Sequence, residues 1–151
     1  MERGILSEST IKLNKLCKTL LSCYRDHALV SLTDEDSVVT PAGLGILTSL
    51  YYTPENDTIS SLADNIDVSK GLVSREVEKL RIGGYVTTTT DKNDRRIVRP
   101  KITEKAIPIV KRELDVLLNL TEKLLDGITE EEFQGFMKTC EIIQENIYCT
   151  G

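Results

Sequence analysis

The sequence predicts a mainly α-helical domain that carries one small β-hairpin. Apolar residues recur at three- and four-residue spacing along most of the chain, which indicates amphipathic helices. One segment, residues 85–101, is instead rich in β-branched residues around a central turn, which indicates two paired strands. A hydrophobic content of 40% and a charged content of 28% are typical of a globular chain. We therefore expect a single domain over residues 1–151.

Two helices are expected before residue 53. Residues 10–28 carry an amphipathic stripe, and Thr40 is suited to cap a second helix in which Pro41 takes the first position, where no amide hydrogen is needed. Gly43 and Gly45 weaken this second helix by about 1 kcal/mol each relative to alanine, so packing must hold it in place. The stripe of the first helix consists of Leu13, Leu16, Leu20, Leu21, Cys23 and Tyr24.

A pair of helices joined by a tight connection follows. A short helix is expected at about residues 59–65, and residues 66–68 form the connection. Ser69 then caps a longer helix over residues 70–82, whose apolar stripe is Leu72, Val73, Val77 and Leu80. Gly83–Gly84 ends that helix, because glycine accepts the left-handed conformation found after a helix.

The hairpin comes next. Residues 85–90 form its first strand, residues 91–94 have turn chemistry, and residues 95–101 form the return strand, in which Pro100 requires a sheet edge. The order of helix, tight turn, helix and hairpin is that of a winged helix-turn-helix, which we place at about residues 40–102.

The C-terminal part is expected to form two more helices. Thr103 is taken to cap a long helix that reaches about Asp126, and Thr129 with Glu132 forms a capping box for the last one. The long helix has a heptad-like seam suited to packing on another helix. The seam consists of Ile107, Val110, Leu114, Leu117, Thr121 and Leu124, and the last helix carries Phe133, Phe136, Met137, Cys140, Ile143 and Ile147.

The charge is unevenly distributed. The whole chain has a net charge of −5, yet residues 58–101 hold nine basic and six acidic residues, and the remainder holds ten basic and eighteen acidic ones. The segment with the two paired helices and the hairpin is therefore basic inside an acidic chain, which leaves it suited to contact phosphates.

The outward face of the second helix of the pair is one candidate nucleic-acid reader. Serine and arginine side chains can reach base edges in the major groove, and lysine can hold phosphate. A plain solvated helix face is the alternative reading of this helix taken alone. The outward residues are Lys70, Gly71, Ser74, Arg75, Glu78 and Lys79.

The hairpin tip favours the nucleic-acid reading. Asp94, Arg95 and Arg96 place two guanidinium groups where a wing meets the electronegative minor groove. Asp94 can bond to Arg96 and fix the tip so that Arg95 inserts, or the two arginines exchange these roles. A winged helix that only binds proteins is the alternative, and it would not need exposed arginines at this tip.

Four stretches of the chain, at residues 62–80, 83–86, 91–96 and 102–106, resemble the multiple-antibiotic-resistance regulator (MarR) family. The resemblance implies a homodimer built from helices at about residues 5–28 and 103–149. It also implies that the protein binds a palindromic DNA operator, usually as a repressor, and that a small ligand or an oxidant releases it from the DNA. The residues expected to contact double-stranded DNA are Ser69, Lys70, Gly71, Ser74, Arg75, Lys79, Lys92, Asn93, Arg95 and Arg96, with Asp94 supporting the tip.

The sequence leaves two kinds of effector open, an oxidant and a small ligand. Cys17 and Cys23 lie in the first helix, either as plain free thiols or as a redox sensor, since family members that sense peroxides use a cysteine near that helix. A small ligand would instead occupy a pocket between the first, second and fifth helices, near Tyr51 or Tyr52, unless those tyrosines belong to the core. Nothing in the sequence identifies the ligand, the operator or the regulated genes, or decides between repression and activation.

Several other classes of protein are not favoured. The four cysteines form no CxxC pair and there is one histidine, His27, so we expect no metal and no other cofactor. No nucleophile is paired with a base, and Asp34 and Asp36 lie in a loop without a metal-ligand pattern, so we expect no enzyme. No apolar run is long enough to span a membrane and the start has no signal-peptide core, which predicts a cytoplasmic protein.

Overall fold

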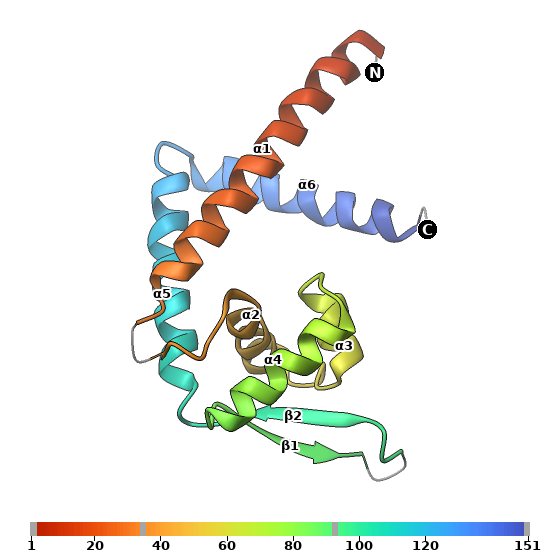
Figure 1. Ribbon diagram of the computed structural model, residues 1–151. Helices are drawn as coiled ribbons and strands as arrows, with labels where there is room; N and C mark the ends of the chain where they lie inside the picture. Colours follow the sequence, from red (N-terminus) through yellow and green to blue (C-terminus); the bar gives the residue numbers. More distant parts are fainter. Residues whose placement is uncertain (1–2, 34–35, 92–93, 150–151) are drawn as a thin grey trace. The chain divides into compact units, whose positions relative to one another are not determined.

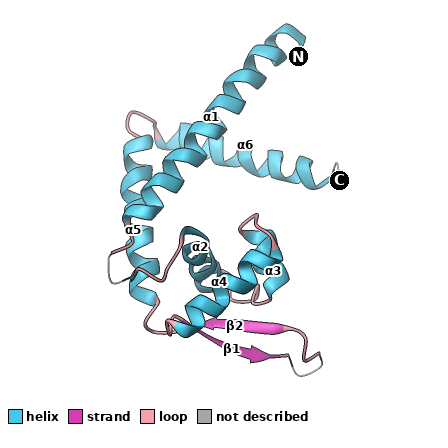
Figure 2. Ribbon diagram, in the orientation of Figure 1, coloured by secondary structure: helices cyan, strands magenta, loops and turns pink. Residues whose placement is uncertain are grey.

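The computed structural model describes residues 3–33, 36–91 and 94–149, and the chain forms two compact units, Met1–Leu117 and Leu118–Gly151. The described chain is mainly helical, with a single hairpin, as predicted (Figures 1 and 2). In chain order the elements are α1 (Arg3–Val30), α2 (Pro41–Tyr52), α3 (Ile59–Asn65), α4 (Lys70–Ile82), β1 (Val86–Thr90), β2 (Val98–Ile102), α5 (Ile107–Leu124) and α6 (Glu130–Cys149). The first helix is longer at both ends than the apolar stripe predicted.

The helix-turn-helix begins and ends as its sequence predicts. Ser69 accepts a hydrogen bond from the amide of Leu72 at the start of α4, and Gly84 after its end has a positive φ of 76°. In the connection between α3 and α4, Asp67 takes the left-handed conformation with a φ of 52°, which aspartate tolerates better than most residues. A feature not predicted is the capping box of α3, in which Thr58 and Ser61 each accept from the other's amide.

The two strands pair antiparallel, with Val86 opposite Ile102 and Thr90 opposite Val98. The return strand begins at Val98 and not at Arg95, so the predicted start was wrong. The reason is the turn itself, because the amide of Ile97 donates to the carbonyl of Asp94 and closes the turn before the strand begins.

Tight packing between α2 and α4 holds the winged part together. A Cβ added to Gly43 would lie 3.6 Å from a methyl of Leu80 and 3.7 Å from a carboxylate oxygen of Glu76, which are ordinary van der Waals distances, so Gly43 packs directly beside these two residues of α4. The fully buried side chains of this core come from α2, α3, α4, the hairpin and α5; the largest are Leu44, Ile46, Leu47, Leu62, Leu80, Ile109, Val73, Val86, Val110 and Pro100.

The start of α5 differs from the sequence prediction. Thr103 does not cap it, since the helix begins at Ile107 and the Thr103 hydroxyl donates to the carbonyl oxygens of Gly84 and Tyr85 instead. This hydroxyl ties the end of the hairpin to the end of α4. The core also includes Val110, so it continues past residue 102 into the first turns of α5.

In the second unit, α6 begins with the predicted capping box. The hydroxyl of Thr129 and its amide both donate to the Glu132 carboxylate, at 2.8 and 2.9 Å, and the amide of Glu132 donates back to the hydroxyl. Among the helices within the described residues, none combines the length and the apolar character that crossing a membrane requires.

Candidate nucleic-acid interface

The outward face of α4 is open to solvent. All six of the residues that helical spacing placed on that face are exposed, and so is the cap Ser69. On the opposite side Val73, Val77 and Leu80 are buried against α2, α3 and β1. The helix is therefore anchored along one side and leaves Ser74 and Arg75 at mid-helix free to meet a partner.

Two groups of basic side chains in the first unit differ in whether a carboxylate holds them. Lys79, Arg81, Arg99 and Arg112 each form an ion pair with a nearby carboxylate. In the part of the chain that the structure describes, no ion pair or side-chain hydrogen bond engages the exposed cations of the second group. That group consists of Lys70, Arg75, Arg95 and Arg96, all of them predicted DNA contacts.

Lys79 was also predicted to contact DNA, but its ammonium lies 2.8 Å from the carboxylate of Glu76. Glu76 is buried and accepts a second hydrogen bond, of 2.6 Å, from the hydroxyl of Thr40. Burial acts to raise the pKa of Glu76, but the bonds from Lys79 and Thr40 outweigh it and lower the pKa. Sequence reasoning missed Glu76, although it lies three residues after Val73 on the inward side of the helix.

At the hairpin tip, Asp94 supports the turn and leaves the arginines free. Its carboxylate accepts the backbone N–H of Arg96 at 2.9 Å, so the bond to Arg96 runs to the main chain and not to the guanidinium. Both Arg95 and Arg96 are exposed. Lys92 and Asn93, also predicted as contacts, lie outside the described residues.

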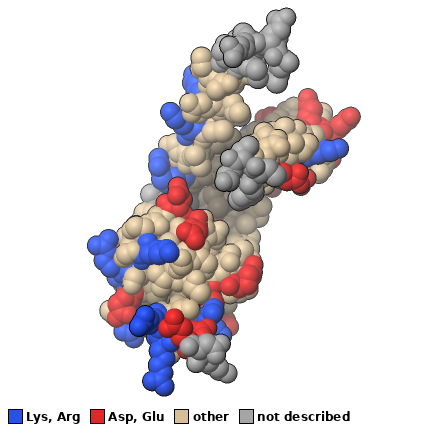
Figure 3. Space-filling model, turned by 90° about the vertical axis from the view of Figure 1, so that its right-hand side faces the viewer, with Lys and Arg blue, Asp and Glu red and all other residues tan. Residues whose placement is uncertain are grey.

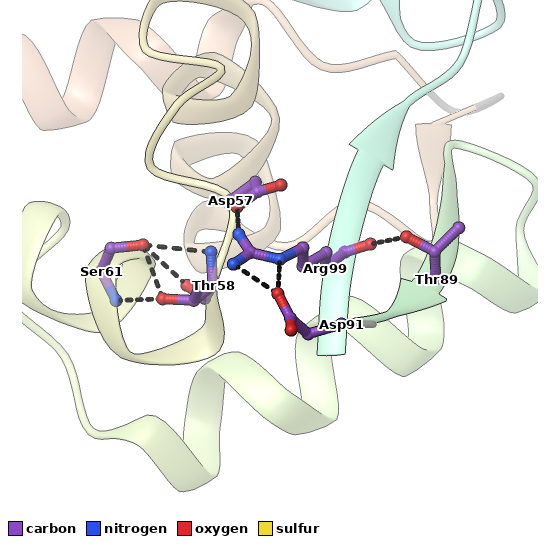
Figure 4. A network of polar contacts seen from close by, with 6 residues as sticks. All are labelled: Asp57, Thr58, Ser61, Thr89, Asp91 and Arg99. Atoms are coloured by element: carbon purple, nitrogen blue, oxygen red, sulfur yellow. Dashed lines mark hydrogen bonds and ion pairs between the residues drawn. The ribbon is translucent and has the colours of Figure 1, made fainter. Parts of the chain in front are cut away.

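Arg99 fastens the hairpin to the helix-turn-helix (Figure 4). Its guanidinium donates to the carboxylate of Asp91 at the end of β1 and to that of Asp57 just before α3. The hydrogen bonds that Arg99 donates to Asp91, first, and to Asp57 raise the pKa of Arg99 above its ordinary value. The contact fixes the angle of the hairpin, and the sequence held no local signal for it, because 42 residues separate Arg99 from Asp57.

A groove of about 280 Å³ runs between the hairpin and the start of α3. Lys70 and Arg96 reach it from the two sides, and the hydroxyl-bearing Thr58 and Ser60 line it together with Ile59, Ile97 and Val98. Figure 3 shows lysine and arginine side chains protruding at the hairpin end of one face, with aspartate and glutamate among them. Lys70 and Arg96 are both suited to contact phosphate.

The predicted effector residues are accessible. Cys17 is exposed and Cys23 is half-buried, with its Sγ 3.9 Å from Nδ1 of His27. Tyr51 and Tyr52 are 37% and 49% exposed, so the interpretation as core residues was wrong. Within the described ranges, no three Cys, His, Asp or Glu side chains gather as metal ligands.

Comparisons with known proteins agree with this geometry. Residues 39–97 match the sequence model of the MarR family. A MarR family protein from Bacillus stearothermophilus has a similar solved structure, with a TM-score of 0.77, 18% sequence identity, and coverage of 98% of this chain and 99% of the other. A MarR transcriptional regulator from Methanosarcina mazei Go1 gives a TM-score of 0.70 at 23% identity, covering 91% and 99%. Streptococcus pneumoniae FabT, solved in complex with DNA, gives 0.70 at 18% identity, covering 97% and 99%.

The sequence match covers the winged part, and the similarity of fold extends over nearly the whole chain. The sequence match agrees with the predicted class of regulator. The winged part of the chain, residues 39–97, matches the MarR family, and solved structures of that family share the fold over nearly the whole chain.

Proposed function

We propose that the chain binds double-stranded DNA through α4 and the hairpin. The observation that carries the proposal is the group of exposed cations without ion pairs on α4 and at the hairpin tip, Lys70, Arg75, Arg95 and Arg96, whereas the neighbouring Lys79, Arg81 and Arg99 are held by carboxylates. Charged groups left unpaired at a surface are suited to neutralise phosphates. The similar fold of FabT, which was solved in complex with DNA, supports the proposal.

The two cationic regions have different tasks in this proposal. Ser74 and Arg75 at mid-helix read base edges in the major groove, where a bidentate arginine contributes roughly 1–3 kcal/mol of discrimination. Arg95 and Arg96 enter the minor groove of the DNA, where contacts report shape and potential more than base identity. Arg96 also lines the groove between the hairpin and α3. Ser69, Gly71, Lys79, Lys92 and Asn93 complete the proposed contact set.

The test is selection of genomic fragments by the purified protein, followed by affinity measurements on the selected and on random duplexes. Arg75→Ala is expected to weaken the selected duplex far more than the random one, whereas Arg95→Ala and Arg96→Ala weaken both. Arg81→Ala is the matched control on the same helix, because Glu78 holds its guanidinium at 2.7 Å. Equal losses on both duplexes for Arg75→Ala would show that Arg75 contacts only phosphate.

We further propose a homodimer on a palindromic operator. Its support is the large apolar side chains that each chain leaves exposed on α1 and α6, since such residues are normally covered by a partner. Sedimentation is expected to give the mass of two chains at micromolar concentration, and a monomer with full operator affinity would contradict the proposal. The exposed residues are Ile11, Leu13, Leu16 and Leu21 on α1, and Phe136, Met137, Ile142, Ile143 and Ile147 on α6.

Repression relieved by an effector is the proposed regulatory role. The accessible thiols of Cys17 and Cys23 suit an oxidant, and a small ligand is the other candidate effector. Replacing both cysteines by serine is expected to leave operator affinity within a few-fold. Release of the wild type but not of this double variant by peroxide would favour oxidation over a small ligand as the signal, and no effect of peroxide on either protein would exclude oxidation.

A winged helix that binds only proteins is the second candidate function. Such a protein would not need exposed arginines without ion pairs at the hairpin tip. Arg95 and Arg96 are exposed there, which favours DNA binding. Failure to enrich any DNA fragment at low salt, where phosphate contacts are strongest, would favour this alternative.

A further inference from the structure

The end of α1 is joined to α5 by a cluster of polar contacts around Arg112. The Nε of Arg112 donates to the carbonyl oxygen of Ser31 at 3.2 Å, and a terminal nitrogen of its guanidinium donates to the carboxylate of Asp36. Ser31 directly follows α1, and Asp36 lies in the chain that leads into α2. All three residues belong to the first unit, and together they form what we name the Arg112 clamp.

Asp36 is the buried partner in this clamp. It is 7% exposed, and the oxygen that pairs with Arg112 also accepts hydrogen bonds from the amide and the hydroxyl of Thr33, at 3.1 and 2.9 Å. The carbonyl oxygen of Asp36 accepts from the amide of Val39, whose side chain belongs to the core of the winged part. The carboxylate is therefore held in place by its own segment and offers Arg112 a fixed acceptor.

Arg112 is held just as firmly by its own helix. Ile109 and Val110, within one turn before it, are fully buried in the same core. A planar guanidinium that donates to two acceptors also has a defined orientation, which a lysine ammonium would not have. The clamp therefore joins the segment after α1 to α5 at a defined angle.

The helix α1 itself has little else to fix its direction. Every residue of α1 whose burial the structure describes is exposed or half-buried. Leu32, just after the helix, packs against the core, but apolar contacts have no preferred direction. Among the described residues of the first unit, the polar contacts of Arg112 are thus the best suited to set the angle between α1 and the winged part.

This angle matters in the proposed homodimer, where the apolar side chains of α1 meet the partner. The direction of α1 then sets the separation and the relative rotation of the two α4 helices. On a palindrome these helices must match two half-sites that lie about one helical turn, or a multiple of it, apart, and one added base pair rotates the second half-site by about a tenth of a turn.

We propose that Arg112 is a positioning residue that sets the half-site spacing accepted by the dimer. It is not one of the proposed DNA contacts, so its loss is expected to leave the reading of one half-site intact and to remove the preference for one spacing. The inference rests on the proposed DNA-binding function and on the proposed homodimer.

The first experiment needs no DNA. A nitroxide label is attached to Gly71→Cys on α4, in a full chain whose four native cysteines are replaced by serine. A Cβ at Gly71 meets no atom within 4 Å, so the label is expected to be tolerated. Pulsed dipolar electron paramagnetic resonance then measures the distance between the two labels of a dimer.

The distance distribution is expected to be narrow with the native clamp and clearly broader in Arg112→Met. Distributions of equal width would overturn the proposal. A sample without dipolar coupling between labels would show a monomer, which refutes the proposed homodimer and removes this inference with it.

The second experiment measures affinity for the selected operator, for operators with one base pair added or removed between the half-sites, and for a duplex with one half-site. The wild type is expected to lose about tenfold in affinity when the spacing changes, and Arg112→Met less than about threefold. Affinity for the single half-site is expected to stay within about twofold in both proteins, since α4 and the hairpin are unchanged.

Three further variants assign the effect to the clamp. Lys111→Met removes an exposed cation from the same helix and is the matched control, which is expected to keep the wild-type spacing preference. Asp36→Asn weakens the same ion pair from the other side and is expected to resemble Arg112→Met, so the result does not depend on the folding of one variant. Arg112→Lys can reach only one of the two acceptors and is expected to be intermediate.

The wild-type spacing preference in a folded Arg112→Met variant would overturn the proposal. An equal loss on the single half-site would overturn it as well, because Arg112 would then act on the reading of DNA and not on spacing. A protein that binds none of these duplexes refutes the proposed DNA binding, whereas the label distances still report on the clamp, so the two failures are distinguishable.

Discussion

Two glutamates of the first unit are almost equally buried, with 4% of Glu76 and 7% of Glu113 exposed, but their surroundings differ. Glu76 lies where α4 meets the start of α2 and receives one hydrogen bond from a lysine and one from a threonine. Glu113 on α5 receives one from a threonine only. The comparison indicates that the hydrogen bonds of Glu76 offset the cost of burying its charge, whereas at Glu113 the cost of burial is the larger effect.

The same difference sets opposite responses to pH. The pKa of Glu76 is lowered by folding, so the unfolded chain binds more protons and the stabilisation by Glu76 is lost as pH falls through the folded pKa. The pKa of Glu113 is raised by folding, so the folded chain binds more protons and stability falls as pH rises toward the folded pKa.

The largest effect is expected from Glu76→Ala. It removes the acceptor of Thr40 and the partner of Lys79 and leaves a gap beside Gly43, so the free energy of unfolding is expected to fall by about 3 kcal/mol. Urea denaturation at neutral pH measures it. A loss below about 1 kcal/mol, the size of one ordinary hydrogen bond, would contradict the structural role given to Glu76.

A matched pair of threonine variants sharpens the comparison. Thr40→Val removes both the cap of α2 and a donor to Glu76, and is expected to cost about 2 kcal/mol. Thr48→Val removes only the donor to Glu113, and is expected to cost about 1 kcal/mol. Thermal unfolding of both variants in one buffer ranks them, and the reverse order would show that the Glu113 region carries more of the stability.

The smallest expected effect has the opposite sign. Glu113→Gln removes a buried charge while keeping the shape, so this variant is expected to unfold at a higher temperature than the wild type at neutral pH. The gain is expected to vanish below the ordinary pKa of glutamate, where the wild-type carboxyl is protonated in both the folded and the unfolded state. A gain that persists in acid would mean that the cause is packing and not charge.

Much of this fold was predictable because its signals are local. The caps at Thr40 and Ser69, the outward face of α4 and the glycines after it follow from residues less than a few turns apart. The hydrogen bonds of the buried acids could not be predicted from the sequence, because Thr48 and Glu113 are 65 residues apart and no periodicity connects them. Thr103 had the right residue type for a cap, but its hydroxyl donates to the carbonyl oxygens of Gly84 and Tyr85, and α5 begins only at Ile107.

The ion pairs of Arg99 affect how the salt dependence of DNA binding is interpreted. Its side chain is 34% exposed, so dissolved salt screens its attraction to Asp57 and Asp91 in part. Added salt therefore loosens the hairpin at the same time as it competes for the phosphates. The slope of affinity against ionic strength therefore includes both the loosening of the hairpin and the competition for phosphates. The number of phosphate contacts inferred from this slope will exceed the number that the protein makes. Repeating the titration with Arg99→Met, which cannot form the ion pairs, separates the two contributions.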